Sequence, residues 1–73
     1  MKGDITMRAF YTDHLGFSAD LCLMLNSERI RLTVYSPERH CIHRKYYATW
    51  EIAKATLRFM LPGAVNDLTH QPI

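Results

Sequence analysis

Residues Asp20 to Tyr47, DLCLMLNSERIRLTVYSPERHCIHRKYY, decide the fold of this chain. An apolar run at 21–25 leads into a turn at 26–28, and residues 29–35 then alternate strictly between polar and apolar. Because successive side chains of a strand point to opposite faces, this pattern predicts a β-hairpin. A second turn at 36–39 leads to a third extended segment, His40 to Tyr47.

The two strands of the hairpin must place their aliphatic side chains on the same side of the sheet. Only that register hides both apolar rows together, and a slip of one residue would expose them. The side chains predicted to lie beneath a covering element are Leu21, Leu23 and Leu25 from the first strand and Ile30, Leu32 and Val34 from the second.

An amphipathic helix is predicted after the third strand. Thr49 is suited to cap its N-terminus, Glu51 places an anion in the first turn, and Pro62-Gly63 ends it after Leu61. A helical period of 100° per residue groups one apolar side, with Trp50 and Phe59 at its edges. That side consists of Ile52, Ala53, Thr56, Leu57 and Met60.

The two ends of the chain are less strongly patterned. Residues Ile5 to Thr12 alternate as an edge strand would, although Met7 to Leu15 before Gly16 could also form a short helix, and we favour the strand. The tail is expected to add one helical turn around Val65 to Leu68 and then fray. The overall prediction is a single α+β domain over 1–73, with a three- to four-stranded antiparallel sheet and one main C-terminal helix on one face.

Composition limits the function classes. The chain of 73 residues is 48% hydrophobic with a net charge of +2, and it contains neither a long apolar run nor the basic-then-apolar start of a signal peptide. Cys22 and Cys41 fall within predicted strands, which favours reduced thiols over a disulfide. We therefore expect a soluble cytoplasmic protein that does not associate with a membrane.

No set of residues spells out a catalytic or metal site. His40, Cys41 and His43 lie close together, but a zinc site needs about four ligands and no paired spacing supplies the rest. The carboxylates are scattered through turns and helix ends, where capping and solvation explain them. We expect no enzyme activity, no metal and no cofactor.

If the helix covers one sheet face, the other face is left to solvent or to a partner. Arginine, tyrosine and methionine are enriched in protein interfaces, although the same side chains also serve simply to solvate an exposed sheet. The residues predicted to bind a partner on this face are Tyr11, Met24, Arg29, Arg31, Thr33 and Tyr35, with Cys22 beside them and Phe10 as the alternative to Tyr11.

The order of several short motifs resembles a small phage-encoded anti-CRISPR protein that inhibits the type I-F surveillance complex. The motifs are His14-Leu15-Gly16-Phe17, the strand ending at Asn26, the strand Arg29 to Val34, the helix start Tyr47 to Glu51, and Leu61-Pro62-Gly63. The resemblance implies a catalysis-free inhibitor whose sheet binds the Cas7-type backbone subunits and keeps target DNA from pairing with the guide. It places Met24 where the family uses a strand tyrosine and Tyr35 where it uses an acidic residue.

A shorter resemblance, over Arg29 to Leu61, is to the arm-type DNA-binding domains of phage integrases. In those domains a three-stranded sheet enters the major groove, where cationic side chains read guanine edges and hold phosphates. It implies DNA contacts from Arg29, Arg31, His43, Arg44 and Lys45. The sequence thus predicts an inhibitor that docks on a type I CRISPR complex, with a sheet-type DNA-binding module as the alternative, and it leaves open a homodimer through the same face.

Overall fold

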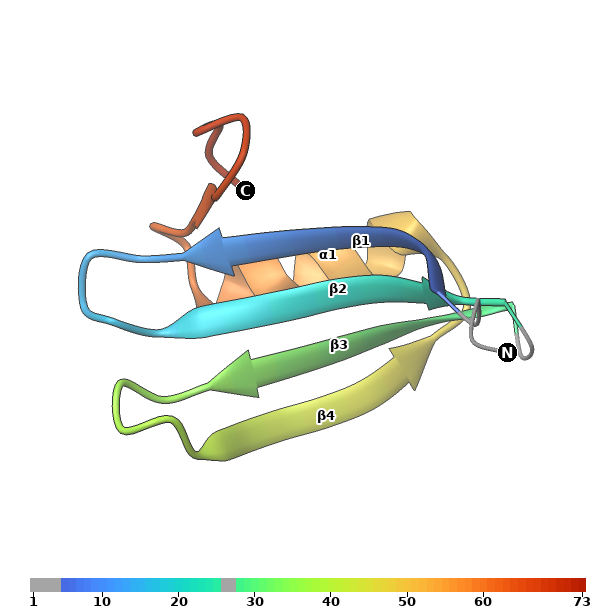
Figure 1. Cartoon of the computed structure of the whole chain (residues 1–73), viewed down its shortest axis with the longest axis horizontal. Coiled ribbons are helices and arrows are strands. Elements are labelled where there is room, and N and C mark those ends of the chain that lie inside the picture. The colour runs from blue at the N-terminus through green and yellow to red at the C-terminus, as the bar shows by residue number, and fades with distance from the viewer. Residues whose placement is uncertain (1–4, 26–27) are drawn as a thin grey trace.

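The computed structural model describes residues 5–25 and 28–73, and there it shows one antiparallel sheet with one helix on it (Figure 1). The strands lie side by side in the order β4-β3-β2-β1-β5. The elements in chain order are β1 (Ile5–Thr12), β2 (Ser18–Met24), β3 (Arg29–Tyr35), β4 (Cys41–Tyr47), α1 (Trp50–Met60) and β5 (Val65–Asn66). The predicted α+β class is confirmed, and so is the strand over Ile5–Thr12.

The register of the central hairpin is the predicted one. Leu21 lies opposite Leu32 and Leu23 opposite Ile30, so both aliphatic rows occupy the side that α1 covers. Leu25 is the exception, because β2 ends at Met24 and the Leu25 side chain is 53% exposed. Asn26 and Ser27 of the predicted turn, like residues 1–4, lie outside the described part of the chain.

The helix begins and ends where its capping residues predict. The Thr49 hydroxyl accepts a hydrogen bond of 3.1 Å from the Ile52 amide, and Leu61 closes the last turn by donating its amide to the Leu57 carbonyl at 2.7 Å. The predicted apolar side is only partly in contact with the sheet. A narrow stripe on Ala53 and Leu57 is fully buried, whereas Phe59 points away from the sheet and is 89% exposed.

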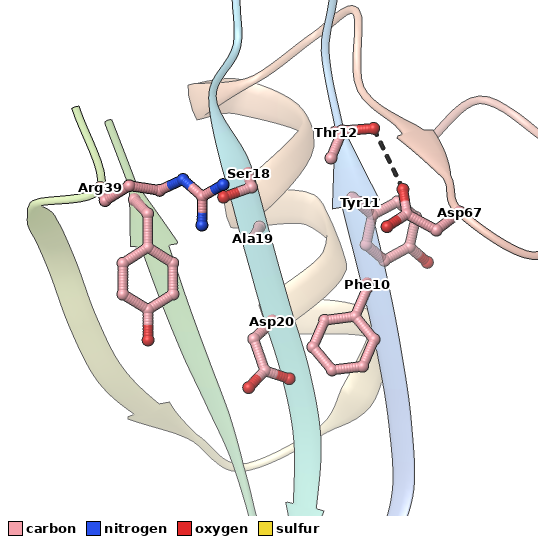
Figure 2. A pocket seen from close by; sticks show the side chains of 9 residues that line it. Phe10, Tyr11, Thr12, Ser18, Ala19, Asp20, Arg39 and Asp67 are labelled. Atoms are coloured by element: carbon pink, nitrogen blue, oxygen red, sulfur yellow. Dashed lines mark hydrogen bonds between the residues drawn. The ribbon is translucent and has the colours of Figure 1, made fainter. Parts of the chain in front are cut away.

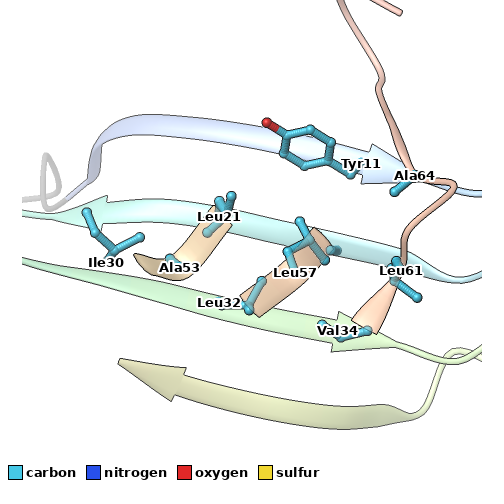
Figure 3. Close-up of a cluster of buried hydrophobic side chains, with 10 residues drawn as sticks. Tyr11, Leu21, Ile30, Leu32, Val34, Ala53, Leu57, Leu61 and Ala64 are labelled. Atoms are coloured by element: carbon cyan, nitrogen blue, oxygen red, sulfur yellow. The ribbon is translucent and has the colours of Figure 1, made fainter. Parts of the chain in front are cut away.

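The hydrophobic core lies between α1 and the covered side of β1, β2 and β3 (Figure 3). Its fully buried leucines are Leu21, Leu32 and Leu57. Burying each of them stabilises the fold by about 1.5–3 kcal/mol relative to leaving it in water. Tyr11 belongs to this core and is 5% exposed, so the prediction that its side chain lies on the uncovered face is wrong.

The tail forms a short strand and a closed loop where a helical turn and fraying were predicted. Val65–Asn66 pairs with Tyr11 and Thr12 of β1, and the Asp67 amide donates to the Phe10 carbonyl at 2.9 Å. The tail supplies partners to backbone groups at the end of β1 that an edge strand would leave unpaired. In the described residues no helix is long and apolar enough to cross a membrane.

Candidate binding surface on the open sheet face

The side of the sheet opposite α1 is covered by no helix or strand of the described chain, and we call it the open face. Strand alternation and the pairing registers assign its side chains. They are Arg8, Phe10 and Thr12 on β1; Ser18, Asp20, Cys22 and Met24 on β2; Arg29, Arg31, Thr33 and Tyr35 on β3; and Cys41, Arg44 and Tyr46 on β4.

The middle of the open face is buried although no backbone element covers it. Cys22 and Thr33 are 0% and 1% exposed. Longer side chains from the neighbouring positions lie over them: the Arg44 Nε donates to the Thr33 hydroxyl at 3.3 Å, and the Cys22 and Met24 sulfurs are 3.8 Å apart. A partner on this face would therefore meet arginine, methionine and aromatic side chains first.

Arg8 and Asp20 form an ion pair on this face. The Nε and one terminal nitrogen of Arg8 lie 3.3 Å from the two carboxylate oxygens of Asp20. The Asp20 side chain is only 12% exposed, whereas that of Arg8 is 39% exposed. The guanidinium carbon of Arg8 also lies 5.4 Å from the centre of the Phe10 ring, close enough for a cation–π contact. This pair fixes Arg8 beside the aromatic ring.

Arg31 lies at the centre of the open face, between Cys22 on β2 and Tyr46 on β4. Burial lowers the pKa of Arg31, but Cys22, a hydrogen bond to Tyr46 and the Asp20 carboxylate more than offset this effect, and the net pKa lies above its ordinary value. The guanidinium is thus charged throughout the physiological range. Its buried Nε has no hydrogen-bond partner within the described chain.

A hollow of about 400 Å³ opens at one end of this face (Figure 2). Phe10 and Tyr35 line it from β1 and β3, and Ser18, Ala19 and Asp20 line it from β2 between them. Tyr11 and Thr12 of β1 also line it, as do two residues from loops. Arg39 follows β3, and Asp67 follows β5, where its carboxylate accepts a hydrogen bond of 3.0 Å from the Thr12 hydroxyl.

Five of the six predicted partner-binding residues lie on the open face, and the sixth does not. The five are Met24, Arg29, Arg31, Thr33 and Tyr35. Tyr11 is in the core, and its neighbour Phe10 takes the outward position. Sequence reasoning missed Arg8 and Asp20. Alternation in residues 5–12 places Arg8 on the same side as Phe10, so that signal was present for Arg8.

The five cationic residues implied by the integrase resemblance are divided between the two faces. Arg29, Arg31 and Arg44 lie together on the open face. The pairing of β3 with β4 is irregular between Val34 and Tyr35. On the far side of this irregularity, His43 and Lys45 of β4 lie opposite Val34 and Leu32, whose side chains are on the face covered by α1. The His43 ring instead stacks on Tyr47, with Nε2 and the hydroxyl oxygen 2.9 Å apart.

No three histidine, cysteine, aspartate or glutamate side chains of the described residues gather as metal ligands would. Cys41 lies opposite Tyr35 and is exposed, while His43 lies opposite the buried Val34, so these two neighbouring side chains do not share a face.

The fold and this surface define a small α+β domain with one covered and one open sheet face. The sequence matches no protein-family model, and neither a curated protein nor a solved structure matches the chain. Any functional conclusion therefore rests on the side chains of the open face.

Proposed function

We propose that the protein is a nucleic-acid-binding module that acts by binding, without catalysing a reaction, and that its ligand lies on the open face. The observation that carries this proposal is the charge of that face. Its strands present four arginines, Arg8, Arg29, Arg31 and Arg44, against one carboxylate, Asp20.

The net charge of +2 understates the potential at this surface. Asp67 lies at the edge of the hollow, while Asp13 is in the β1–β2 loop and Glu51 is in the first turn of α1. Arginine binds phosphate through a planar fork of donors, and a ligand that replaces condensed counterions with such contacts gains affinity from their release. The charges are arranged as a polyanionic ligand requires.

Exposed aromatic rings accompany the arginines. Phe10 is 48% exposed and Tyr46 is 50% exposed, and both belong to the open face. Rings on an open sheet bind the faces of nucleobases, and stacking contributes about 1–3 kcal/mol per base. Cations for the backbone and rings for the bases are thus present on the same surface.

Fluorescence anisotropy with labelled single-stranded and duplex DNA, measured across salt concentrations, tests the proposal. For four phosphate contacts we expect the affinity to fall by about 50-fold for a single strand and about 150-fold for a duplex between 50 and 200 mM salt. No binding of either DNA at low salt would refute nucleic-acid binding.

Two matched variants locate the site. Arg29→Ala and Lys54→Ala each remove one cation, the first from the open face and the second from α1. We expect Arg29→Ala to weaken binding and to reduce the salt slope by about one, because one phosphate contact is lost. Lys54→Ala should leave both the affinity and the slope unchanged, and equal effects of the two variants would argue against a specific face.

The second candidate function is the inhibitor that docks on a type I CRISPR complex, and the composition of the open face favours it. Arg31, Tyr35 and Met24 are of the kinds enriched in protein interfaces, and arginine and tyrosine dominate interface hot spots. Because this face is basic, the Cas7-type surface it binds would have to be acidic. Co-elution of the purified protein with a type I complex, and its loss in Arg31→Ala, would support the inhibitor function. If the protein co-elutes with no type I subtype, the inhibitor function is refuted.

A further inference from the structure

We infer that the hollow on the open face seats one unpaired nucleobase that presents hydrogen-bond donors to Asp20, with the adjoining phosphate on Arg39. This inference rests on the proposed nucleic-acid binding and deepens it, because it makes the ligand single-stranded and selects among the bases. Four features of the hollow support it: its walls, its floor, its charge and its rim.

The walls suit a flat ring. Phe10 on β1 and Tyr35 on β3 stand on the two strands that flank β2, and between them β2 contributes the small Ser18 and Ala19 together with Asp20. Neighbouring strands lie about 4.8 Å apart, so β1 and β3 flank a space about 10 Å wide. A base inserted here has an aromatic side chain on each flank, which is how proteins hold bases taken out of a helix.

The floor offers an acceptor. The Asp20 carboxylate lines the hollow with 12% of its side chain exposed, and its fork with Arg8 is long, at 3.3 Å for each oxygen. Oδ1 has Arg8 Nε as its ion-pair partner but receives no well-aligned hydrogen bond from any described group. A buried carboxylate with unfilled acceptor capacity favours a ligand that brings donors.

The surrounding charge disfavours a cationic side chain as that donor. Arg8 and Arg31 both act on Asp20, and Arg39 lies at the rim, so an incoming lysine or arginine would meet three like charges against the two carboxylates of Asp20 and Asp67. A nucleotide avoids this repulsion, since its base donates hydrogen bonds while remaining neutral and its phosphate is anionic. One ligand thus satisfies both the carboxylate and the arginines.

The rim gives the nucleotide a direction. Arg39 has a positive φ of 73°, and its loop is closed by hydrogen bonds of 2.8 Å between the Arg39 amide and the Ser36 carbonyl and between the Ser36 amide and the His40 carbonyl. Its guanidinium extends toward β2, and Asp67 lies on the opposite side of the hollow (Figure 2). Asp67 repels phosphate, so the backbone of the ligand passes on the Arg39 side.

Asp20 should distinguish among the bases. The Watson–Crick edge of guanine has two adjacent donors, N1–H and the 2-amino group, which match the two oxygens of a carboxylate. Adenine and cytosine offer one amino group, and thymine places its single N–H between two carbonyl oxygens that Asp20 would repel. In a duplex this edge is already paired, so the hollow requires an unpaired guanine.

The test uses 11-mer thymidine oligonucleotides in which only the central base varies, because a single guanine avoids the self-association of guanine tracts. Anisotropy with the full chain should show about tenfold tighter binding for central guanine than for thymine, as one bidentate contact provides. Central hypoxanthine, which lacks the 2-amino group, should fall between them. Equal affinity for all central bases would overturn the inference while leaving the proposed nucleic-acid binding intact.

Two variants tie the preference to the hollow. Asp20→Asn should abolish the guanine preference yet bind the all-thymine oligonucleotide at least as well as the original protein, because a negative charge is removed. Phe10→Leu should weaken binding of every oligonucleotide by about fivefold and retain the preference. If loss of its circular dichroism signal showed that Asp20→Asn does not fold, the base preferences of Phe10→Leu and of the hypoxanthine series would still test the inference. Retention of the guanine preference in folded Asp20→Asn would overturn the assignment of Asp20.

Discussion

Both faces of the sheet have fully buried side chains at their centre, but these are buried by different means. On the covered face, Leu21 and Leu32 lose their exposure to an eleven-residue helix. On the open face, Cys22 and Thr33 lose theirs to the long side chains of their neighbours. The first arrangement excludes water with apolar groups and serves stability. The second brings charged and aromatic groups to the surface, where they are available to a ligand.

This difference predicts that the two faces respond differently to truncation. Side chains of the covered face have close-packed neighbours, so their removal leaves a cavity. Arg29 of the open face is exposed, so its removal should cost little stability and mainly change binding. Three substitutions test this contrast, and a fourth tests the N-terminal cap of the covering helix.

The largest effect is expected in the core. Leu57→Ala removes a fully buried side chain from the middle of α1, and we expect the free energy of unfolding to fall by about 2–5 kcal/mol. Urea denaturation followed by circular dichroism measures this change. Leu68→Ala is the matched control, because Leu68 is 87% exposed and should change stability by less than about 0.5 kcal/mol. Equal effects at the two leucines would mean that α1 is not packed on the sheet.

The next effect separates the partly buried Arg8–Asp20 ion pair from the other charges of the open face. Arg8→Ala leaves the Asp20 carboxylate, 12% exposed, without its partner, and we expect a loss of about 1–2 kcal/mol of unfolding free energy. Arg8→Lys should recover part of the lost unfolding free energy, because lysine restores the positive charge but not the two-nitrogen contact with the carboxylate. An unchanged denaturation midpoint in Arg8→Ala would show that Asp20 does not depend on this pair.

A comparable or smaller effect is expected at the N-terminus of the helix. Thr49→Ala removes the hydroxyl that accepts from the Ile52 amide, which should lower the unfolding free energy by about 1 kcal/mol. Thr49→Ser keeps that acceptor and should be close to the original protein in thermal denaturation. If serine and alanine were equally destabilising, the methyl group of Thr49, and not its cap, would be the stabilising part.

The smallest effect on stability is expected at the most exposed arginine of β3. Arg29→Ala should change the unfolding free energy by less than about 0.5 kcal/mol while weakening DNA binding by about threefold to tenfold at low salt. Parallel denaturation and anisotropy measurements check both halves of this prediction. A large stability loss with unchanged binding would reverse the roles assigned to the two faces.

Local patterning was sufficient to predict most of the fold. The alternation at 29–35 specified the β2–β3 register because only one pairing buries both Leu21 and Leu32. Thr49 and Pro62 specified the helix because their side chains act on the backbone next to them.

The tail could not be predicted in the same way. The pairing of Val65–Asn66 with Tyr11 and Thr12 joins segments more than fifty residues apart, and nothing in the local sequence around Val65 encodes that contact. The Asn66 side chain, which accepts hydrogen bonds from the Leu68 and Thr69 amides, closes the loop that follows.

The candidate site was predicted in part for the same physical reason. Alternation placed Arg31 and Tyr35 on the open face, since a strand alone determines this. The hollow depends instead on Arg39 and Asp67, which two separate loops place on its opposite sides (Figure 2). Tyr11 was misplaced because an aromatic side chain with a hydroxyl suits an interface and a core boundary equally, and the pairing of β1 decides between them.

The most direct test of the open face as the binding surface is an NMR titration of the labelled protein with the single-guanine oligonucleotide. We predict that the perturbed signals include the Nε–H groups of Arg8, Arg31 and Arg44 and the backbone amides around Phe10 and Asp20. The backbone amide signals of Lys54 and Arg58 on α1 should not shift. Perturbations centred on Lys54 and Arg58, with the arginine signals of the open face unmoved, would contradict this assignment.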